Sequence, residues 1–309
     1  MRKRADPRGS GTKQGTQVSC RIGGRPLAKR VSFAEVWEPA RRYNLGLGDR
    51  VGEGNISSQN PQVVVTQLGS YWWIKPSASA IASHEIHVWK FPLEAPHTTV
   101  AEAGEVLSPD ERQRAARFHF ERDARRFKIA RARMRSILGS YLEHPPNELC
   151  FVYTKHGKPS IENPKRDIRF NLSHSGERAV LAVVQGREVG VDIEQIRENV
   201  EIDELAERFF SSGEKELLRP LARPHKLRNF FRFWTCKEAF LKAQAVGLTR
   251  SLASFTVDLN AVPPRLSDAE EIHSEDSKWS LLELDCEPGY ASALAVEGSI
   301  GSVKDFRQD

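Results

Sequence analysis

The sequence is poor in cysteine and has no long apolar run. Its four cysteines, Cys20, Cys150, Cys236 and Cys286, form no C-x-x-C pair and have no histidine at ligand spacing. This pattern argues against a zinc site and against a disulfide framework, and it favours a reducing compartment. The best apolar run, Ala179–Val184, has the length of a strand and falls far short of a membrane span. We therefore expect a cytoplasmic protein with no membrane partner.

Acidic residues are scarce in the first thirty positions, where positive charge gathers. The 309 residues carry a formal charge of +5. Residues 1–30 contain nine Lys or Arg and one acid, a net charge of +8, so residues 31–309 carry −3. A nucleic-acid arm and a transit peptide are the alternatives for such a segment, but no aromatic residue is interleaved with its charges and Ser is sparse. We expect no nucleic-acid partner for the folded body.

Residues 1–83 lack sustained apolar periodicity. Val63–Val65 and Tyr71–Ile74 are possible strands, but Gly and Ser interrupt the sequence between them, and no apolar core of a secretory signal is present. Low hydrophobicity of this kind is typical of disorder. We expect residues 1–83 to form a largely disordered extension of unknown function.

The remaining sequence repeats one pattern. Ser108-Pro109-Asp110-Glu111 and Ser211-Ser212-Gly213-Glu214 are capping boxes, and a long aromatic-rich helix is expected after each. Each capping box also follows an alternating strand pattern, Glu85–Trp89 or Val189–Glu194. The repeat predicts two related lobes, residues 84–186 and 187–309.

Other periodic segments complete this outline. Residues 300–309 are expected to be frayed. The predicted helix, turn and strands are Arg122–Tyr141, His156–Pro159, Ala179–Val184, Phe255–Leu259, Trp279–Leu284 and Ala291–Val296.

Carboxylates occupy unusual positions in the second lobe. Alternation in Val189–Glu194 places Asp192 and Glu194 on one face of a strand. In the helix that follows, Glu238 falls within the apolar stripe and has Lys237 and Lys242 on its flanks. Each feature alone fits a solvated strand edge or a surface ion pair. Together, three acids with lysines beside them favour a hard divalent ion that also binds a phosphate.

The paired motifs G-V-D-I-E and W-x-x-K-E-A-x-x-K, about forty residues apart, resemble the 4′-phosphopantetheinyl transferase superfamily in its two-lobed, Sfp-like branch. The resemblance extends from about Glu85 to the C-terminus. It implies an α+β fold of two pseudo-twofold-related lobes, each a small sheet packed with helices. It also implies a monomeric enzyme that moves the phosphopantetheine arm of coenzyme A to a serine of an acyl or peptidyl carrier protein. Mg²⁺ would be the cofactor, and 3′,5′-ADP would be released.

The resemblance also assigns roles to the acids and to one lysine. Asp192, Glu194 and Glu238 would bind Mg²⁺. Lys242 would stabilise negative charge on the leaving group, and Glu238 would be the base for the carrier serine, either directly or through a metal-bound water. The catalytic set is thus Asp192, Glu238 and Lys242.

A second set of residues is assigned by resemblance to coenzyme A. N-x-S-H-S, expected on a tight turn, would direct Ser173 and His174 at the 3′-phosphate; an acyl hydrolase is excluded because no G-x-S-x-G surrounds them. Glu111 departs from the family, since many bacterial members are basic there, which puts one phosphate contact in doubt. The full set of predicted coenzyme A residues is Arg114, Lys158, Ser173, His174, Lys237 and Lys242.

Two further possibilities stay open. A non-catalytic binder of coenzyme A or of a carrier protein could share this fold, although such a protein has no physical reason to keep three clustered acids. The segment Arg208–Arg219, which mixes apolar and basic residues, is either a docking surface for an acidic carrier or simply the buried face of a short helix.

Overall fold

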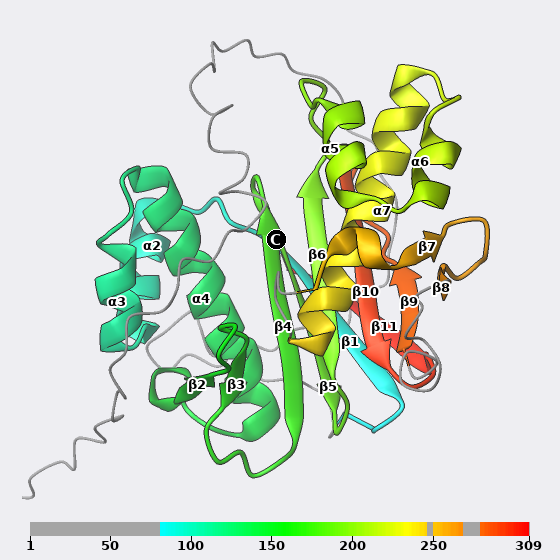
Figure 1. The fold of residues 1–309 in the computed structure, drawn as a ribbon. Coiled ribbons are helices and arrows are strands. Elements are labelled where there is room, and N and C mark those ends of the chain that lie inside the picture. The colour runs from blue at the N-terminus through cyan, green and yellow to red at the C-terminus, as the bar shows by residue number, and fades with distance from the viewer. Residues whose placement is uncertain (1–80, 246–249, 268–278, 309) are drawn as a thin grey trace, which may run out of the picture.

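The computed structural model describes residues 81–245, 250–267 and 279–308. They form a mixed α and β structure in which two sheets lie between two layers of helices (Figure 1). The possible strands at Val63–Val65 and Tyr71–Ile74, and the extension as a whole, lie outside the described residues except for its last three positions. None of the described helices has both the length and the apolar character needed to cross a membrane.

The first lobe contains one strand, three helices, a short hairpin and two further strands. The predicted helices and the strands Glu85–Trp89 and Ala179–Val184 are present, whereas helix α2 and strand β4 were not predicted. Its elements are β1 (Glu85–Pro92), α2 (His97–Val106), α3 (Pro109–Ala115), α4 (Glu121–Leu142), the 3-10 turn η2 (Pro146–Glu148), β2 (Phe151–Tyr153), β3 (Pro159–Ile161), β4 (Ile168–Ser175) and β5 (Arg178–Gln185).

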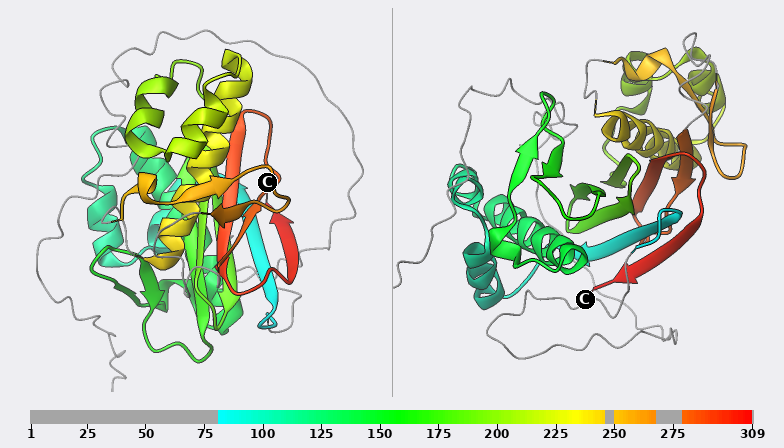
Figure 2. Two further views of the ribbon diagram at one scale, coloured as in Figure 1. Left: turned by 45° about the vertical axis from the view of Figure 1, so that its right-hand side comes forward. Right: turned by 90° about the horizontal axis from the view of Figure 1, so that it is seen from below.

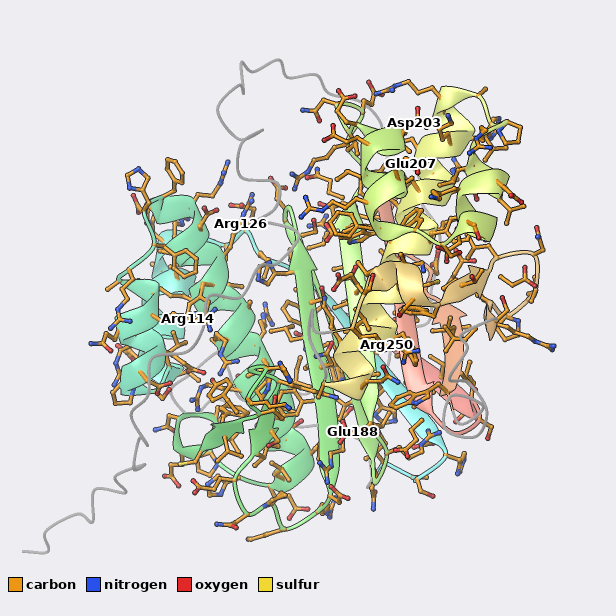
Figure 3. All side chains as sticks on the ribbon, viewed as in Figure 1. Arg114, Arg126, Glu188, Asp203, Glu207 and Arg250 are labelled. Atoms are coloured by element: carbon orange, nitrogen blue, oxygen red, sulfur yellow. The ribbon has the colours of Figure 1, made fainter. Side chains whose placement is uncertain are left out.

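The second lobe repeats this order after the chain passes Glu188, which is labelled in Figure 3. Helix α5 and strand β8 were not predicted. The elements are β6 (Val189–Gln195), α5 (Ile202–Phe209), α6 (Ser212–Leu218), α7 (Arg223–Gln244), the 3-10 turn η4 (Leu252–Ser254), β7 (Thr256–Asp258), β8 (Arg265–Ser267), β9 (Trp279–Glu283) and β10 (Tyr290–Glu297).

Sheet order is the same in both lobes. The first, last and penultimate strands are neighbours, as β1-β5-β4 in one sheet and β6-β10-β9 in the other, and all these pairs are antiparallel. Alternate residues of β1, β5, β6 and β10 meet in a central core between the sheets, and the opposite faces pack on the two helical layers. Figure 2 shows the helices outside the two sheets. The repeat confirms two similar lobes, as their capping boxes predicted.

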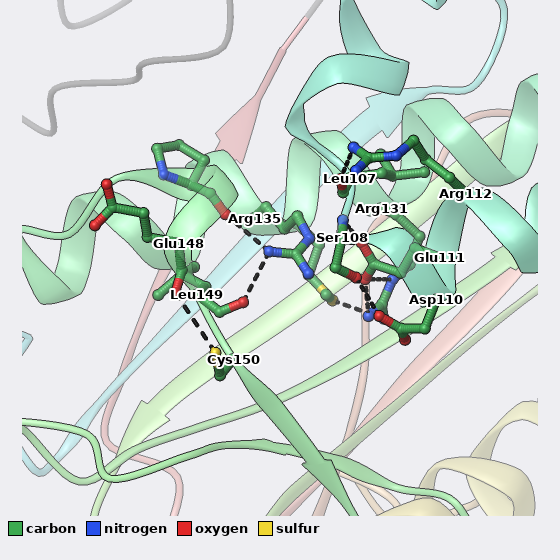
Figure 4. A network of polar contacts seen from close by, with 12 residues as sticks. Leu107, Ser108, Asp110, Glu111, Arg112, Arg131, Arg135, Glu148, Leu149 and Cys150 are labelled. Atoms are coloured by element: carbon green, nitrogen blue, oxygen red, sulfur yellow. Dashed lines mark hydrogen bonds and ion pairs between the residues drawn. The ribbon is translucent and has the colours of Figure 1, made fainter. Parts of the chain in front are cut away.

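Each capping box ends in a buried ion pair with the long helix. In the first lobe, Glu111 is buried and accepts from Arg131 and Arg135, and Arg135 also donates to the carbonyls of Pro146 and Leu149 (Figure 4). Glu111 therefore has a structural role here. Its pKa is lowered because the two guanidinium groups outweigh burial.

The second lobe repeats this device with other side chains. Glu214 lies 2.9 Å from the ammonium nitrogen of Lys237, and both side chains are fully buried. That nitrogen donates to the carbonyls of Leu252, at 2.7 Å, and Phe255, at 2.5 Å. Each lobe thus uses a buried cation on its long helix to join the capping-box acid to the 3-10 turn.

Two expectations were wrong. Residues 300–309 do not fray throughout, because β11 (Ser302–Arg307) joins the first-lobe sheet beside β1, in parallel. Its Phe306 ring stacks on Trp89 at 4.3 Å between centroids, so the C-terminal strand of the second lobe belongs to the sheet of the first. Among the cysteines, Cys236 and Cys286 are free thiols, but Cys150 is disulfide-bonded, contrary to the expectation from spacing.

Gly190 lets α7 touch β6. A Cβ at this position would lie 2.1 Å from the carbonyl oxygen of Ala239 and 2.3 Å from the amide nitrogen of Ala243. Both contacts are with backbone, which cannot move without displacing the helix. No side chain larger than hydrogen fits between this strand and this helix.

Substitution of Gly190 by Ala should therefore destabilise the protein by at least about 1–3 kcal/mol, the usual cost of overpacking. The matched control is Gly104→Ala in α2, where an added Cβ meets nothing within 4 Å. That change should be neutral or stabilising by up to about 1 kcal/mol, because Ala is the better helix former. Urea unfolding measures both. Equal stability of the Gly190 variant and the wild type would show that the strand and helix can separate at no cost.

Candidate active site

Strand β6 presents two acids toward helix α7. Asp192 and Glu194 are buried, while Val189, Val191 and Ile193 face the central core from the other side of the strand. The contact at Gly190 holds α7 against this face. Glu238 and Lys242 lie one helical turn apart on α7, so the helix brings them beside the two acids.

Asp192 is the centre of the polar contacts. Its Oδ1 accepts from the Ser173 hydroxyl at 2.9 Å and from the Lys242 ammonium at 2.5 Å. Its Oδ2 is buried and has no hydrogen-bond partner among the described residues. Burial raises the pKa of Asp192 despite the ammonium, while Asp192 and then Glu238 raise the pKa of Lys242 against the effect of burial. One carboxylate oxygen thus remains for a ligand.

The other two acids are also held in unfavourable surroundings for a negative charge. Burial, and then repulsion from Asp192, raise the pKa of Glu194 to about 8. Burial is also the main reason that the pKa of Glu238 rises to about 7. Three carboxylates with a single lysine leave excess negative charge when all are ionised. A divalent cation with oxygen preference suits such a donor set.

The predicted metal ligands are not preassembled. Within the described part of the chain, no three His, Cys, Asp or Glu side chains already stand close enough together to hold a metal ion. Lys242 supplies the positive charge at Asp192 in this arrangement. The unpartnered Oδ2 of Asp192 and the raised pKa values of all three acids are the features that fit a cation.

Basic groups of the first lobe lie on the other side of β4. His174 is exposed on β4, and its pKa is lowered by the surrounding protein and then by the charges of Lys242, Arg114 and Arg126. Arg114 is exposed on α3, with its guanidinium carbon 5.3 Å from the centre of the Phe127 ring. Figure 3 labels Arg114 and Arg126 on the helical layer of the first lobe. These groups make this side of the strand suitable for an anion.

Lys158 lies at a separate hollow. A cavity of about 310 Å³ is lined by Lys158, Glu188, Ala243 and Trp279, among others. The Lys158 ammonium binds Glu188 at 2.6 Å and the Ala243 carbonyl at 2.9 Å, and burial lowers its pKa. The cavity is lined by the last residues of α7, starting at Ala243, which follows Lys242. Among the described residues, Lys158 forms no ion pair with Asp192, Glu194 or Glu238.

Two predictions need correction, one about a role and one about secondary structure. Lys237 was assigned to coenzyme A, but its ammonium is fully buried and bound by Glu214 and two carbonyls in the second-lobe core. That assignment is wrong. N-x-S-H-S was expected on a tight turn, but all five residues lie in β4, and the turn begins at Gly176.

The strand geometry separates Ser173 from His174. Successive residues of a strand face opposite sides, so Ser173 is buried against Asp192 while His174 is exposed. Sequence reasoning overlooked Asn171 and Ser175, which share the face of Ser173 and also contact β6. The alternation N-x-S-x-S was the signal that could have identified them.

Comparison with known proteins agrees with this geometry. Residues 188–295 match the family described as the 4′-phosphopantetheinyl transferase superfamily, and residues 94–186 match the family described as 4′-phosphopantetheinyl transferase, N-terminal. The protein HetI of Nostoc sp., named a 4′-phosphopantetheinyl transferase, is 39% identical over 230 residues, which are 74% of this chain and 94% of HetI.

More distant relatives include a second named transferase and a solved structure. Sfp of Bacillus subtilis, also named a 4′-phosphopantetheinyl transferase, is 29% identical over 66% of this chain and 85% of its own. A holo-(acyl-carrier-protein) synthase of Bacillus anthracis, solved with coenzyme A (3′,5′-ADP), is 24% identical with a TM-score of 0.30, over 36% of this chain and 96% of that one. This last likeness is too partial to inform the function. The two family matches and the similarity to HetI show that the chain belongs to the 4′-phosphopantetheinyl transferase superfamily.

Proposed function

We propose that the protein transfers the phosphopantetheine arm of coenzyme A to a serine hydroxyl of an acyl or peptidyl carrier protein, with Mg²⁺ as cofactor and 3′,5′-ADP as leaving product. The observation that carries this proposal is the group of acids at the contact of β6 and α7, where one buried oxygen of Asp192 has no hydrogen-bond partner among the described residues. Family membership supports the same reaction class.

Asp192, Glu194 and Glu238 would hold the metal. When bound, Mg²⁺ neutralises the diphosphate and polarises the phosphorus that is attacked. Lys242 now neutralises Asp192, so we expect its ammonium to turn from Oδ1 toward the diphosphate when the substrates bind. The side chain is 30% exposed, which leaves it room to do so.

Glu238 is suited to remove the serine proton. It lies half-buried, no hydrogen bond from another described residue engages it, and its pKa of about 7 makes its carboxylate a base near neutrality. The serine oxygen then bonds to the β-phosphorus as the bond from that phosphorus to the leaving oxygen of 3′,5′-ADP breaks. Lys242 places a positive charge where the leaving group gains its negative charge.

The coenzyme would extend along β4. His174 and Arg114 offer exposed cationic or donor groups for its 3′-phosphate, and the cavity at Lys158 is a candidate for its nucleotide end. Ser173 would contribute through Asp192 and Lys242, with which it shares hydrogen bonds. We expect the reaction to take place in the cytoplasm with a monomeric enzyme.

Asp192→Asn should abolish transfer while the fold survives, because the amide keeps the shape of the side chain but removes its charge. We expect a loss of more than about 100-fold, as for removal of a charge that stabilises the transition state. The assay mixes protein, coenzyme A, Mg²⁺ and an apo carrier, and the mass of the carrier is read before and after. Asp285→Asn, at an exposed ion pair with Arg307, is the matched control and should keep the wild-type rate.

Two outcomes of that assay count against the proposal. A wild-type protein that leaves the carrier mass unchanged would point to a non-catalytic binder. A near wild-type rate for Asp192→Asn would remove the acids from the mechanism.

Glu194→Gln should raise the melting temperature of the metal-free protein. Because the pKa of Glu194 rises from 4.5 to about 8 on folding, the folded state binds its proton more tightly than the unfolded state does. Its contribution to stability therefore falls as pH rises from about 4.5 to 8, and glutamine escapes that loss. The gap between variant and wild type should widen from pH 5 to 8 in EDTA, at about 2–4 °C per kcal/mol. A constant or negative gap would contradict the burial cost, and Mg²⁺ should stabilise the wild type more than the variant.

The carrier is expected to dock beside α5 and α6. Phe210 and Leu218 of this segment are buried, as expected for a helix face, but Leu217 is 45% exposed and Arg208 and Arg219 are exposed. An apolar anchor with basic neighbours suits an acidic carrier.

Arg219→Glu should raise the KM for the carrier several-fold and leave that for coenzyme A unchanged. The effect should shrink as salt rises, because screening weakens exposed charges. Steady-state kinetics with each substrate varied in turn measures this. Equal changes for both substrates, or none, would exclude this surface.

A further inference from the structure

Strands β4 and β6 lie side by side but belong to different sheets. Their contact is made by side chains of β4, at every second residue. Asn171 accepts from the amide of Val191 at 2.9 Å, Ser173 donates to Asp192, and Ser175 donates to Glu194 at 2.7 Å. We call these three side chains, Asn171, Ser173 and Ser175, the polar seam; all three are buried.

Ser175 uses both hydrogen-bonding capacities of its hydroxyl on β6. It donates to Oε2 of Glu194 and accepts from the amide of Gln195 at 3.1 Å. A hydroxyl with its proton and a lone pair both engaged has a fixed orientation. Among the described residues, this is the one hydrogen bond that reaches the Glu194 carboxylate, and it leaves Oε1 available. Ser175 thus supplies the directional contact that sets the rotation of the Glu194 carboxylate.

We propose that Ser175 is a positioning residue that orients the Glu194 carboxylate for the divalent cation. This inference rests on the proposed function, because it takes Glu194 as a ligand. Asn171 belongs to the same seam and strand, but its hydrogen bond is with the backbone of β6 and not with an acid. Comparing substitutions at Ser175 and Asn171 therefore distinguishes a residue that orients an acid from one that only joins the two strands.

The experiment measures Mg²⁺ affinity by calorimetry on the full chain, without coenzyme A or carrier. Ser175→Ala should weaken Mg²⁺ binding by about 10-fold or more, the usual effect of losing a group that orients a ligand. Asn171→Ala should also lower the melting temperature, since both variants lose hydrogen bonding to β6, yet keep the Mg²⁺ affinity within about twofold. Ser175→Thr retains the hydroxyl and should recover most of the affinity.

The outcomes separate this inference from the function on which it rests. If the wild type binds Mg²⁺ and Asp192→Asn does not, the acid site stands, and equal affinity losses in Ser175→Ala and Asn171→Ala would then overturn the positioning role. If the wild type does not bind Mg²⁺, or Asp192→Asn binds it equally well, both proposals fail. Unchanged affinity in Ser175→Ala at a lowered melting temperature would leave Ser175 a purely structural residue and also overturn the inference.

Discussion

The close contact of α7 with β6 is the constraint on which the site depends. Gly190 leaves no space for a side chain between the strand and the backbone of Ala239 and Ala243. Glu238 is adjacent to Ala239 and Lys242 is adjacent to Ala243, so the backbone contact at the two alanines fixes where both functional side chains leave the helix. The same strand face carries Asp192 two residues after Gly190. A wider separation would move the acids of the strand away from Glu238 and Lys242 of the helix.

The motifs placed Asp192 and Glu194 on one face of a strand and Glu238 on a long helix, as the structure has them, because strand and helix periods determine which residues share a face. Their role as metal ligands stays a prediction. The motifs gave a wrong role to Lys237, because helical periodicity shows on which side of the helix a residue lies but not which residues pack against that side. Glu214 and two carbonyls lie on that flank, and they belong to elements that follow from long-range packing. The capping box that supplies Glu214 was recognised, but its glutamate was expected to serve only the helix end.

Long-range pairing also explains the other failures. β11 is short and mostly polar, and it pairs with a strand more than two hundred residues earlier, so its local sequence carries no sign of that contact. The serines and histidine of N-x-S-H-S resemble turn residues by composition. Their placement in a strand depends on β5 on one side and on the polar seam to β6 on the other. The sequence could predict the local secondary structure and the repeat. It could not predict how the two repeats pack against each other.

The two lobes share a fold, but only the second carries the candidate catalytic side chains on its long helix. Arg135 and Lys237 make the same contacts in the two long helices, so aligning them places Ser136 and Ser140 at the positions of Glu238 and Lys242.

The strands that face the long helices differ between the lobes in the same way. Where β6 turns acids toward α7, β1 turns His87 and Trp89 toward Tyr141 of α4, whose hydroxyl binds both rings. The first lobe therefore joins aromatic side chains through a shared hydroxyl at the place where the second lobe holds acids. The second lobe keeps acids with raised pKa values, and one buried Asp192 oxygen has no hydrogen-bond partner in the part of the chain that the structure describes. This arrangement costs stability unless a cation binds. The first lobe supplies the seam and the basic groups, and the site exists only where the two repeats meet.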